Sequence, residues 1–135
     1  MAKESGLGWT TLSVDDGAGT PRDLRNPVTN FNFSTPRGVQ DTTGVDKSAM
    51  ERLLLLADFS ITLNGVFDDG VNLAHATLKT VPSTSGLRTV SLGVSGQTLA
   101  AECLFTDYGL TRSQAGELTW TSPGVLADGT VPTWS

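Results

Sequence analysis

The sequence has one histidine, one cysteine and no long apolar run, and each shortage excludes a class of protein. With Cys103 alone, no disulfide forms within the chain and no cysteine cluster holds a metal. With His75 alone, a histidine-based catalytic or zinc site would have to recruit Cys103 and distant carboxylates. The longest apolar run, 53–57, is far shorter than the roughly 20 residues of a membrane-spanning helix. The first residues lack the apolar segment of a secretory signal, so none is expected.

Positive charge is also scarce. Nine Lys and Arg residues face 14 Asp and Glu residues, which gives a formal net charge of −5. The basic residues are scattered singly, so the basic stripe that captures a phosphate backbone is missing. Tight nucleic-acid binding is therefore not expected, although an acidic surface can face DNA without gripping it.

Alternating apolar and polar residues predict several long strands. Between 57 and 63, Ala57, Phe59, Ile61 and Leu63 share one face, within a strand expected to span 53–67. The same alternation predicts strands at 88–94 and 97–107, joined by a two-residue turn at Ser95-Gly96. Further strands are expected at 9–14, 24–34, with a bulge and a sheet edge near Pro27, and 117–122. At 135 residues, the chain is predicted to be one mainly β domain spanning 1–135.

One short amphipathic helix is expected after Asp68 and Asp69, which would supply the acids of its first turn. Its apolar residues recur at helical spacing, at Val71, Ala74, Leu78 and Val81.

The segment from about 35 to 52 is rich in Gly, Thr and Asp, has no period, and is too long for an ordinary connection. A merely solvated loop would not need its apolar residues, so an arm that contacts a partner is favoured. The C-terminal tail, about 123–135, is expected to be extended, with Trp134 as an anchor. The candidate self-assembly residues are Arg37, Val39, Gln40, Asp41, Val45, Lys47, Met50 and Trp134.

No arrangement of residues predicts catalysis, a cofactor or a metal site. His75 lies at the margin of the helix's apolar stripe and is expected to be structural and half-buried. The acidic pairs at 15–16 and 68–69 lack the spaced ligands of a calcium loop, and a turn and a helix start explain them. A structural role is therefore favoured over an enzymatic one.

Several segments, taken in order, also carry a family resemblance. They are Thr20-Pro-Arg-Asp-Leu24, Arg37-Gly-Val-Gln-Asp-Thr-Thr-Gly44, 53–67 running into Asn72-Leu-Ala-His75, Leu99-Ala-Ala-Glu-Cys-Leu-Phe-Thr-Asp-Tyr108, Glu117-Leu-Thr-Trp120 and Gly124-Val-Leu-Ala-Asp-Gly129. Together they resemble the major tail tube protein of a long-tailed (siphovirus-type) bacteriophage, of the short single-domain kind found in phages of actinobacteria.

The resemblance implies a fold and a function. The fold would be a β-sandwich or half-barrel of antiparallel strands with one flanking helix. Six copies would close into a ring, with strands joined edge to edge, and rings would stack into a tube through which genome DNA passes. The long loop and the termini would contact neighbouring rings. The protein would need no cofactor. It would assemble in the host cytoplasm and become part of the virion tail, where it would contact tail terminator, tape measure and tail tip proteins.

Other functions stay open. The inner tube protein of a contractile injection system is implied by the same resemblance. A monomeric β-sandwich binding module, using exposed tryptophans for sugar or protein ligands, is the alternative from a different class. A hydrolase or metalloenzyme is a more distant third.

Overall fold

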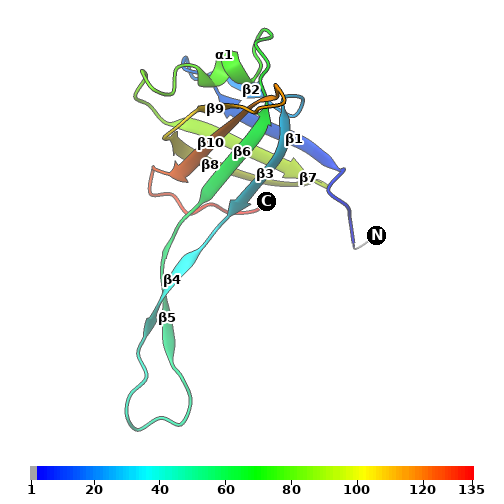
Figure 1. Ribbon diagram of the computed structural model, residues 1–135. Helices are drawn as coiled ribbons and strands as arrows, with labels where there is room; N and C mark the ends of the chain where they lie inside the picture. The colour runs from blue at the N-terminus through cyan, green and yellow to red at the C-terminus, as the bar shows by residue number, and fades with distance from the viewer. Residues whose placement is uncertain (1–2) are drawn as a thin grey trace.

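The computed structural model describes residues 3–135 and consists of strands with one short helix (Figure 1). The strands are β1 (Trp9–Asp15), β2 (Pro21–Asp23), β3 (Val28–Ser34), β4 (Arg37–Asp41), β5 (Arg52–Ala57), β6 (Ser60–Val66), β7 (Arg88–Val94), β8 (Gln97–Phe105), β9 (Gly109–Arg112) and β10 (Leu118–Leu126). The helix, α1 (Ala74–Leu78), lies between β6 and β7 in the chain. α1 does not have the length or apolarity to cross a membrane, and it is the only helix within residues 3–135.

Eight strands form one antiparallel sheet that folds over into two layers. Its order is β2-β1-β7-β8-β10-β6-β3, with β9 also paired to β10. Layer I contains β2, β1, β7 and β8, and layer II contains β9, β10, β6 and β3. The layers join where Cys103 to Phe105 of β8 pair with Gly124 to Leu126 of β10. The predicted sandwich or half-barrel of antiparallel strands with one short helix is confirmed.

The core lies between the two layers because the alternating apolar residues of each strand face inward. In β6, Ile61 and Leu63 are buried, as is Phe59 just before the strand. In layer I, the inward residues of β1 and β7 are buried in the same way. The alternation therefore predicted the core face correctly. α1 adds Ala74 and Leu78 to this core at one end of the sandwich (Figure 1).

The two-residue turn between β7 and β8 is confirmed. Val94 pairs with Gln97, and between them Ser95 and Gly96 have φ angles of 52° and 76°. Two consecutive positive φ angles match the twist of a two-residue hairpin. The bulge near Pro27 is also confirmed, since the β3–β6 register shifts between Val28 and Asn30. β3 is at the end of the strand order, as expected for the sheet edge.

The helix is shorter than predicted. It spans five residues, and its first turn contains no acidic residue. Asp68 lies before the helix, where its Oδ1 accepts a hydrogen bond from the Gly70 N–H at 3.0 Å. Asn72 has a φ of +62°, which is incompatible with helix, so Val71 lies outside it and is 88% exposed. The conformation of Asn72, which the apolar spacing did not reveal, sets the helix start.

Several strand boundaries also differ from the prediction, and two short strands were not predicted. The strand expected at 53–67 divides at Asp58-Phe59 into β5 and β6, and only β6 enters the core. β10 runs to Leu126, so the C-terminal tail begins after it. β2 and β9 were not predicted because they have three and four residues, too few to establish a period.

Cys103 is fully buried on the inward face of β8. Burial, with smaller contributions from Glu102 and Asp128, raises the pKa of the thiol to about 12. An unfolded chain loses this proton near pH 8.5, whereas the folded protein keeps it. Above about pH 9, the unfolded state therefore binds fewer protons, and the free energy of unfolding falls as pH rises.

We expect this fall to reach about 1.4 kcal/mol per pH unit between roughly pH 9 and 12. The measurement is denaturant unfolding at pH 7 and 10.5 for the protein and for Cys103→Ala. Burial also raises the pKa of Tyr108, but that group titrates in both proteins. The difference in free energy of unfolding between the unmodified protein and Cys103→Ala should therefore be smaller at pH 10.5 than at pH 7. If both proteins lost the same free energy of unfolding between these pH values, the assignment to Cys103 would be contradicted.

Candidate assembly surface

An arm, residues 37–57, extends from the sandwich at the end opposite α1 (Figure 1). It is a two-stranded ribbon in which β4 pairs with β5 as a separate antiparallel sheet. It continues the β3–β6 hairpin, since β4 follows β3 and β5 precedes β6. Of the predicted long loop at about 35–52, residues 37–41 therefore form the strand β4, and residues 42–51 form the tip between β4 and β5.

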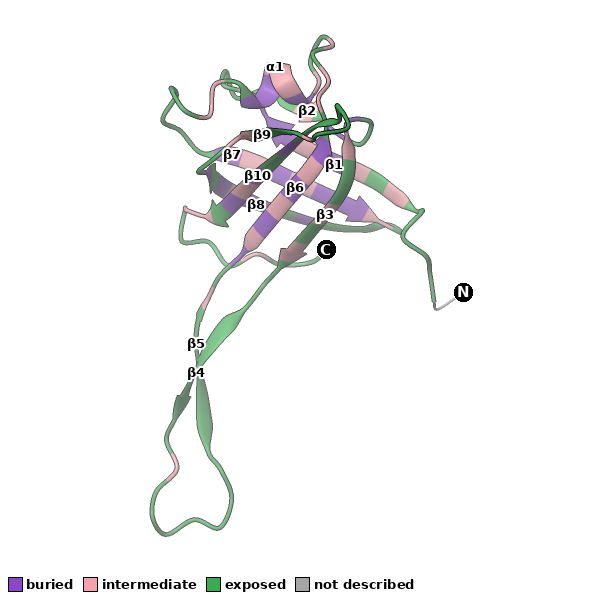
Figure 2. Cartoon of the chain, viewed as in Figure 1, coloured by how far each residue is buried: buried purple, intermediate pink, exposed green. Residues whose placement is uncertain are grey.

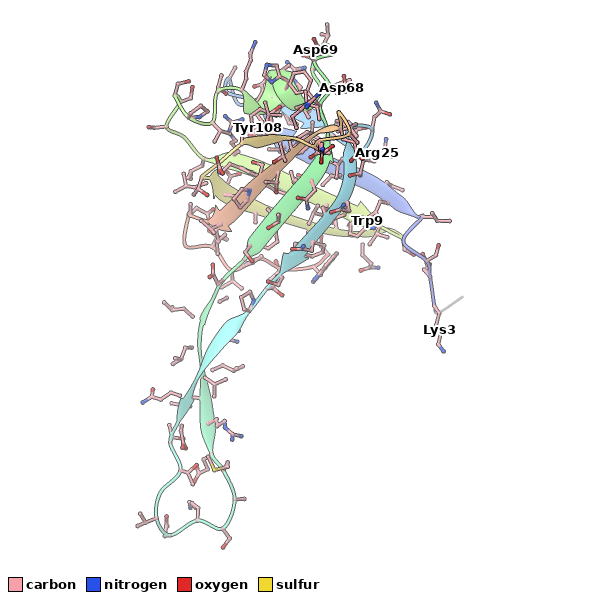
Figure 3. The ribbon with its side chains drawn as sticks, viewed as in Figure 1. Lys3, Trp9, Arg25, Asp68, Asp69 and Tyr108 are labelled. Atoms are coloured by element: carbon pink, nitrogen blue, oxygen red, sulfur yellow. The ribbon has the colours of Figure 1, made fainter. Side chains whose placement is uncertain are left out.

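The arm exposes apolar side chains on both of its faces. Residues 53–56 are consecutive leucines in β5, and successive side chains of a strand point to opposite faces. On one face Leu56 is 90% exposed, and on the other face Leu53 is 57% exposed. Figure 2 shows almost the whole ribbon as exposed, in contrast to the buried stripes of the sandwich, and in Figure 3 its side chains project from both sides. Monomeric soluble proteins rarely expose such a continuous apolar surface, which makes the ribbon a candidate interaction site.

Hydrogen bonds hold the arm in its extended shape. At the tip, the Glu51 N–H donates to Thr43 Oγ1 at 2.8 Å, and the Thr42 N–H donates to the Glu51 carbonyl at 2.9 Å. At the base, Arg37 Nε donates to the Leu55 carbonyl at 3.0 Å. Hydrogen bonds from Thr43 also lower the pKa of Asp41. The exposed leucines are thus presented by an ordered ribbon.

The structure brings seven of the eight predicted assembly residues together on the arm. They are Arg37, Val39, Gln40, Asp41, Val45, Lys47 and Met50. Val39 pairs with Leu54 and Gln40 pairs with Leu53, so the β4 residues share their faces with the leucines of β5. Those leucines were assigned to a core strand from the sequence. Their lack of alternation was the signal that they do not belong to the core.

Trp134 lies on the C-terminal tail, against the sandwich. Its ring centroid is 6.0 Å from that of Phe33, the second-to-last residue of β3. The backbone of Trp134 also forms an antiparallel β-bridge with Leu99. Trp120 is buried and Trp9 packs edge-on against Phe31 at 4.9 Å. The tryptophans therefore do not gather into one exposed platform.

The edges of layer I are partly covered. β2 pairs with Ser13 to Asp15 of β1, and the Leu24 N–H donates to the Leu12 carbonyl. On the other side, the tail covers the free part of β8. Thr98 and Ser135 exchange two backbone hydrogen bonds of 2.9 Å, and the Ala127 N–H donates to the Glu102 carbonyl.

The edges of layer II are open. β3 pairs only with β6, and β9 pairs only with β10, among the strands within residues 3–135. An open edge presents unpaired N–H and C=O groups that template pairing with another chain. Layer II thus has one uncovered edge on each side; the β3 edge was expected from Pro27, whereas the β9 edge was not identified from the sequence.

No catalytic arrangement surrounds His75. Its Nδ1 lies 3.2 Å from the Tyr108 hydroxyl, and its ring packs on Phe67 with centroids 4.9 Å apart. Throughout the described range 3–135, no three His, Cys, Asp or Glu residues are placed to hold a metal ion. Asp16 organises a turn instead, because its carboxylate accepts from the N–H groups of Ala18 and Thr20 and pairs with Arg22 at 3.0 Å.

Comparison with known proteins identifies the fold. No protein-family model and no curated protein matches the chain. A chain in the virion of a native gene transfer agent particle superimposes with a TM-score of 0.74 and 14% identity, covering 98% of this chain and 99% of that one. A chain in the tail of an empty gene transfer agent particle, refined with C6 symmetry, superimposes with a TM-score of 0.71 and 18% identity, covering 98% of both. The protein therefore has the fold of chains found in gene transfer agent particles, over nearly its whole length.

Proposed function

We propose that the protein is a non-enzymatic tail tube subunit that assembles into stacked hexameric rings, which form a channel for genome DNA. The observation that carries this proposal is the pair of open edges on layer II, together with an arm that is apolar on both faces. The fold shared with a C6-symmetric tail supports it.

The open edges supply the contact within a ring. β3 is on one side of layer II and β9 is on the other, so β3 of one copy pairs with β9 of the next. Such a head-to-tail contact repeats around an axis and closes into a ring without leaving a free edge. Layer II of every copy then belongs to one continuous barrel.

The arm supplies the contact between rings. It extends the β3–β6 hairpin past the end of the sandwich, so it reaches beyond its own ring. Since leucines occupy both faces, covering them requires protein on both sides of the ribbon. Burying one leucine contributes about 1.5–3 kcal/mol, and six arms act together in each ring.

In this proposal the protein belongs to a phage-type particle. It assembles in the host cytoplasm and becomes part of the virion tail, where tail terminator, tape measure and tail tip proteins meet the tube. DNA passes through the channel without sequence-specific binding. The same assembly geometry would serve an inner tube surrounded by a contractile sheath, and a sheath gene beside this one would distinguish that case.

The arm contact is tested by Leu56→Ser. Leu56 is 90% exposed, so the change leaves the fold intact, but it removes an apolar side chain that is buried after assembly. We expect the protein concentration needed for tube formation to rise on the order of tenfold or more. Electron microscopy and sedimentation across a concentration series measure this concentration.

Leu104→Ser is the matched control, because Leu104 is a 41% exposed leucine on β8 of layer I, outside the arm and outside the two open strand edges. It should assemble like the unmodified protein. If the unmodified protein stayed monomeric at every concentration, even with assembly partners supplied, the proposed function would be contradicted. Equal assembly of both variants would contradict the role of the arm.

A further inference from the structure

The sandwich has an open side, where β1 of layer I and β3 of layer II lie next to each other. Among the strands of the described range, β2 covers β1 only at Ser13 to Asp15, and β3 pairs with β6 alone. A pocket of about 400 Å³ lies on this side, where Figure 3 labels Trp9 and Arg25. Its lining includes Trp9 and Leu12 of β1, Val28 and Phe31 of β3, and Arg25.

The aromatic side chains at this pocket belong to an incompletely covered rim of the core. The Trp9 ring packs edge-on against Phe31, with centroids 4.9 Å apart, and against Phe33 at 6.2 Å. All three rings, and Val28, are only partly buried where they pack against the core. Complete burial of apolar area is favourable, so an apolar side chain from another molecule would be stabilised in this pocket.

The other side of layer II carries an apolar side chain that is also incompletely covered. Leu110 of β9 pairs with Trp120, whose side chain is buried on the inward face, so Leu110 points to that same face. Thr111, the next residue, pairs with Thr119 and faces outward. Leu110 is 47% exposed, because β10 is the only strand paired with β9 within residues 3–135.

One cross-strand row connects these two sides of layer II. Leu110 pairs with Trp120, Trp120 with Gly65, and Gly65 with Val28, so Leu110 and Val28 are the two ends of the row. The strands of the row alternate in direction, so β9 and β3 run in opposite directions. Rotation about a ring axis keeps these directions. A β9 strand from the next copy therefore continues the antiparallel pattern at β3, with Leu110 on the face of Val28.

We propose that the pocket beside Val28 is a socket for Leu110 of the next copy, so that each subunit completes the core of its neighbour. The inference deepens the proposed function and rests on it. Main-chain hydrogen bonds at a strand edge give affinity, whereas pockets for alternate side chains give specificity. The socket thus sets the register of the β3–β9 contact and excludes pairing of β3 with the β3 edge of another copy, which brings no leucine.

Position is tested by disulfide formation between Leu110→Cys and Val28→Cys in one chain. Within a copy these positions are about 14 Å apart, three strand spacings, so a disulfide forms only between copies. The control chain carries Thr111→Cys and Val28→Cys, which places the first thiol on the opposite face of β9. Cys103 is fully buried, so the introduced thiols are the reactive ones. Each chain is mixed with unmodified subunits so that tubes still form.

We expect oxidised tubes with the Leu110→Cys pair to give covalent dimers on denaturing gels, on the order of tenfold faster than the Thr111→Cys pair, because a disulfide requires facing Cβ atoms. Dispersed subunits should give none. Tubes in which the Leu110→Cys pair gives no dimers, or in which both pairs react equally, would overturn the socket and leave the proposed function standing. Absence of tubes from the unmodified protein would contradict both.

The contribution of the side chain is tested with Leu110→Ser, and Leu104→Ser is again the control because the two leucines are 47% and 41% exposed. The Tm of dispersed Leu110→Ser subunits should stay close to that of the unmodified protein, since Leu110 is half outside the core before assembly. The concentration needed for tube formation should rise about tenfold or more, because the socket no longer receives an apolar group. Equal assembly of the two variants would overturn the inference.

Discussion

Gly65→Ala is expected to lower the free energy of unfolding by about 3 kcal/mol, at the upper end for overpacking a core. A Cβ on Gly65 would lie 2.1 Å from the Pro27 carbonyl oxygen and 2.9 Å from Trp120 Nε1. The backbone oxygen cannot move away unless β3 separates from β6 at its bulge. The same Cβ would disturb the bond of 2.8 Å that Trp120 Nε1 donates to the Val66 carbonyl.

Thermal and denaturant unfolding measure the change, with an expected decrease in Tm of roughly 10 °C. Gly86→Ala is the control, because no atom lies within 4 Å of the Cβ that it would add. Its stability should stay within about 0.5 kcal/mol of the unmodified protein. Equal stabilities for the two variants would mean that β3 and β6 do not approach as closely as described.

Arg88→Met is expected to lower the free energy of unfolding by about 3–5 kcal/mol. Arg88 is 5% exposed, and its Nη1 donates to the carbonyls of Asp15 and Thr77 at 3.0 and 2.8 Å. Its Nη2 donates to Thr80 Oγ1 at 2.9 Å. Methionine fills similar volume but leaves these buried acceptors without donors, so α1 loses its attachment to the end of β1.

Arg25→Met is the matched control for the arginine substitution. Arg25 makes a two-pronged pair with Asp23, with an Nη2 to Oδ2 distance of 3.0 Å, but both side chains are exposed. Exposed ion pairs contribute little because water and salt screen them. Its Tm should match that of the unmodified protein, and a comparable loss in both variants would contradict the role of burial at Arg88.

The sequence predicted those parts of the fold that depend on alternation or on local turn chemistry. Ile61 and Leu63 identify the core face of β6 because a strand with one buried face repeats every two residues. Ser95-Gly96 identifies a hairpin because few residues accept positive φ angles. These signals are local, so no knowledge of the partner strand is needed.

The parts that were missed depend on non-local pairing. Leu54 and Leu56 resemble core residues until their strand is seen to pair with β4 away from the sandwich. The open edge at β9, unlike the β3 edge expected from Pro27, follows from the strand order, and no single segment contains that order. The arm was nevertheless predicted as a partner contact, because Val39, Val45 and Met50 are apolar in an otherwise polar segment. That role stays a prediction until assembly is measured.

The position of the arm at one end of the sandwich gives the proposed polymer a direction. At one terminus of such a tube, six leucine-rich ribbons project without a receptor, and at the other terminus six receptors lack a ribbon. The two termini would therefore grow at different rates and need different caps. A protein that caps the terminus with projecting arms must provide an apolar cleft for them, whereas a protein that caps the terminus with empty receptors must bring a leucine-rich hairpin of its own.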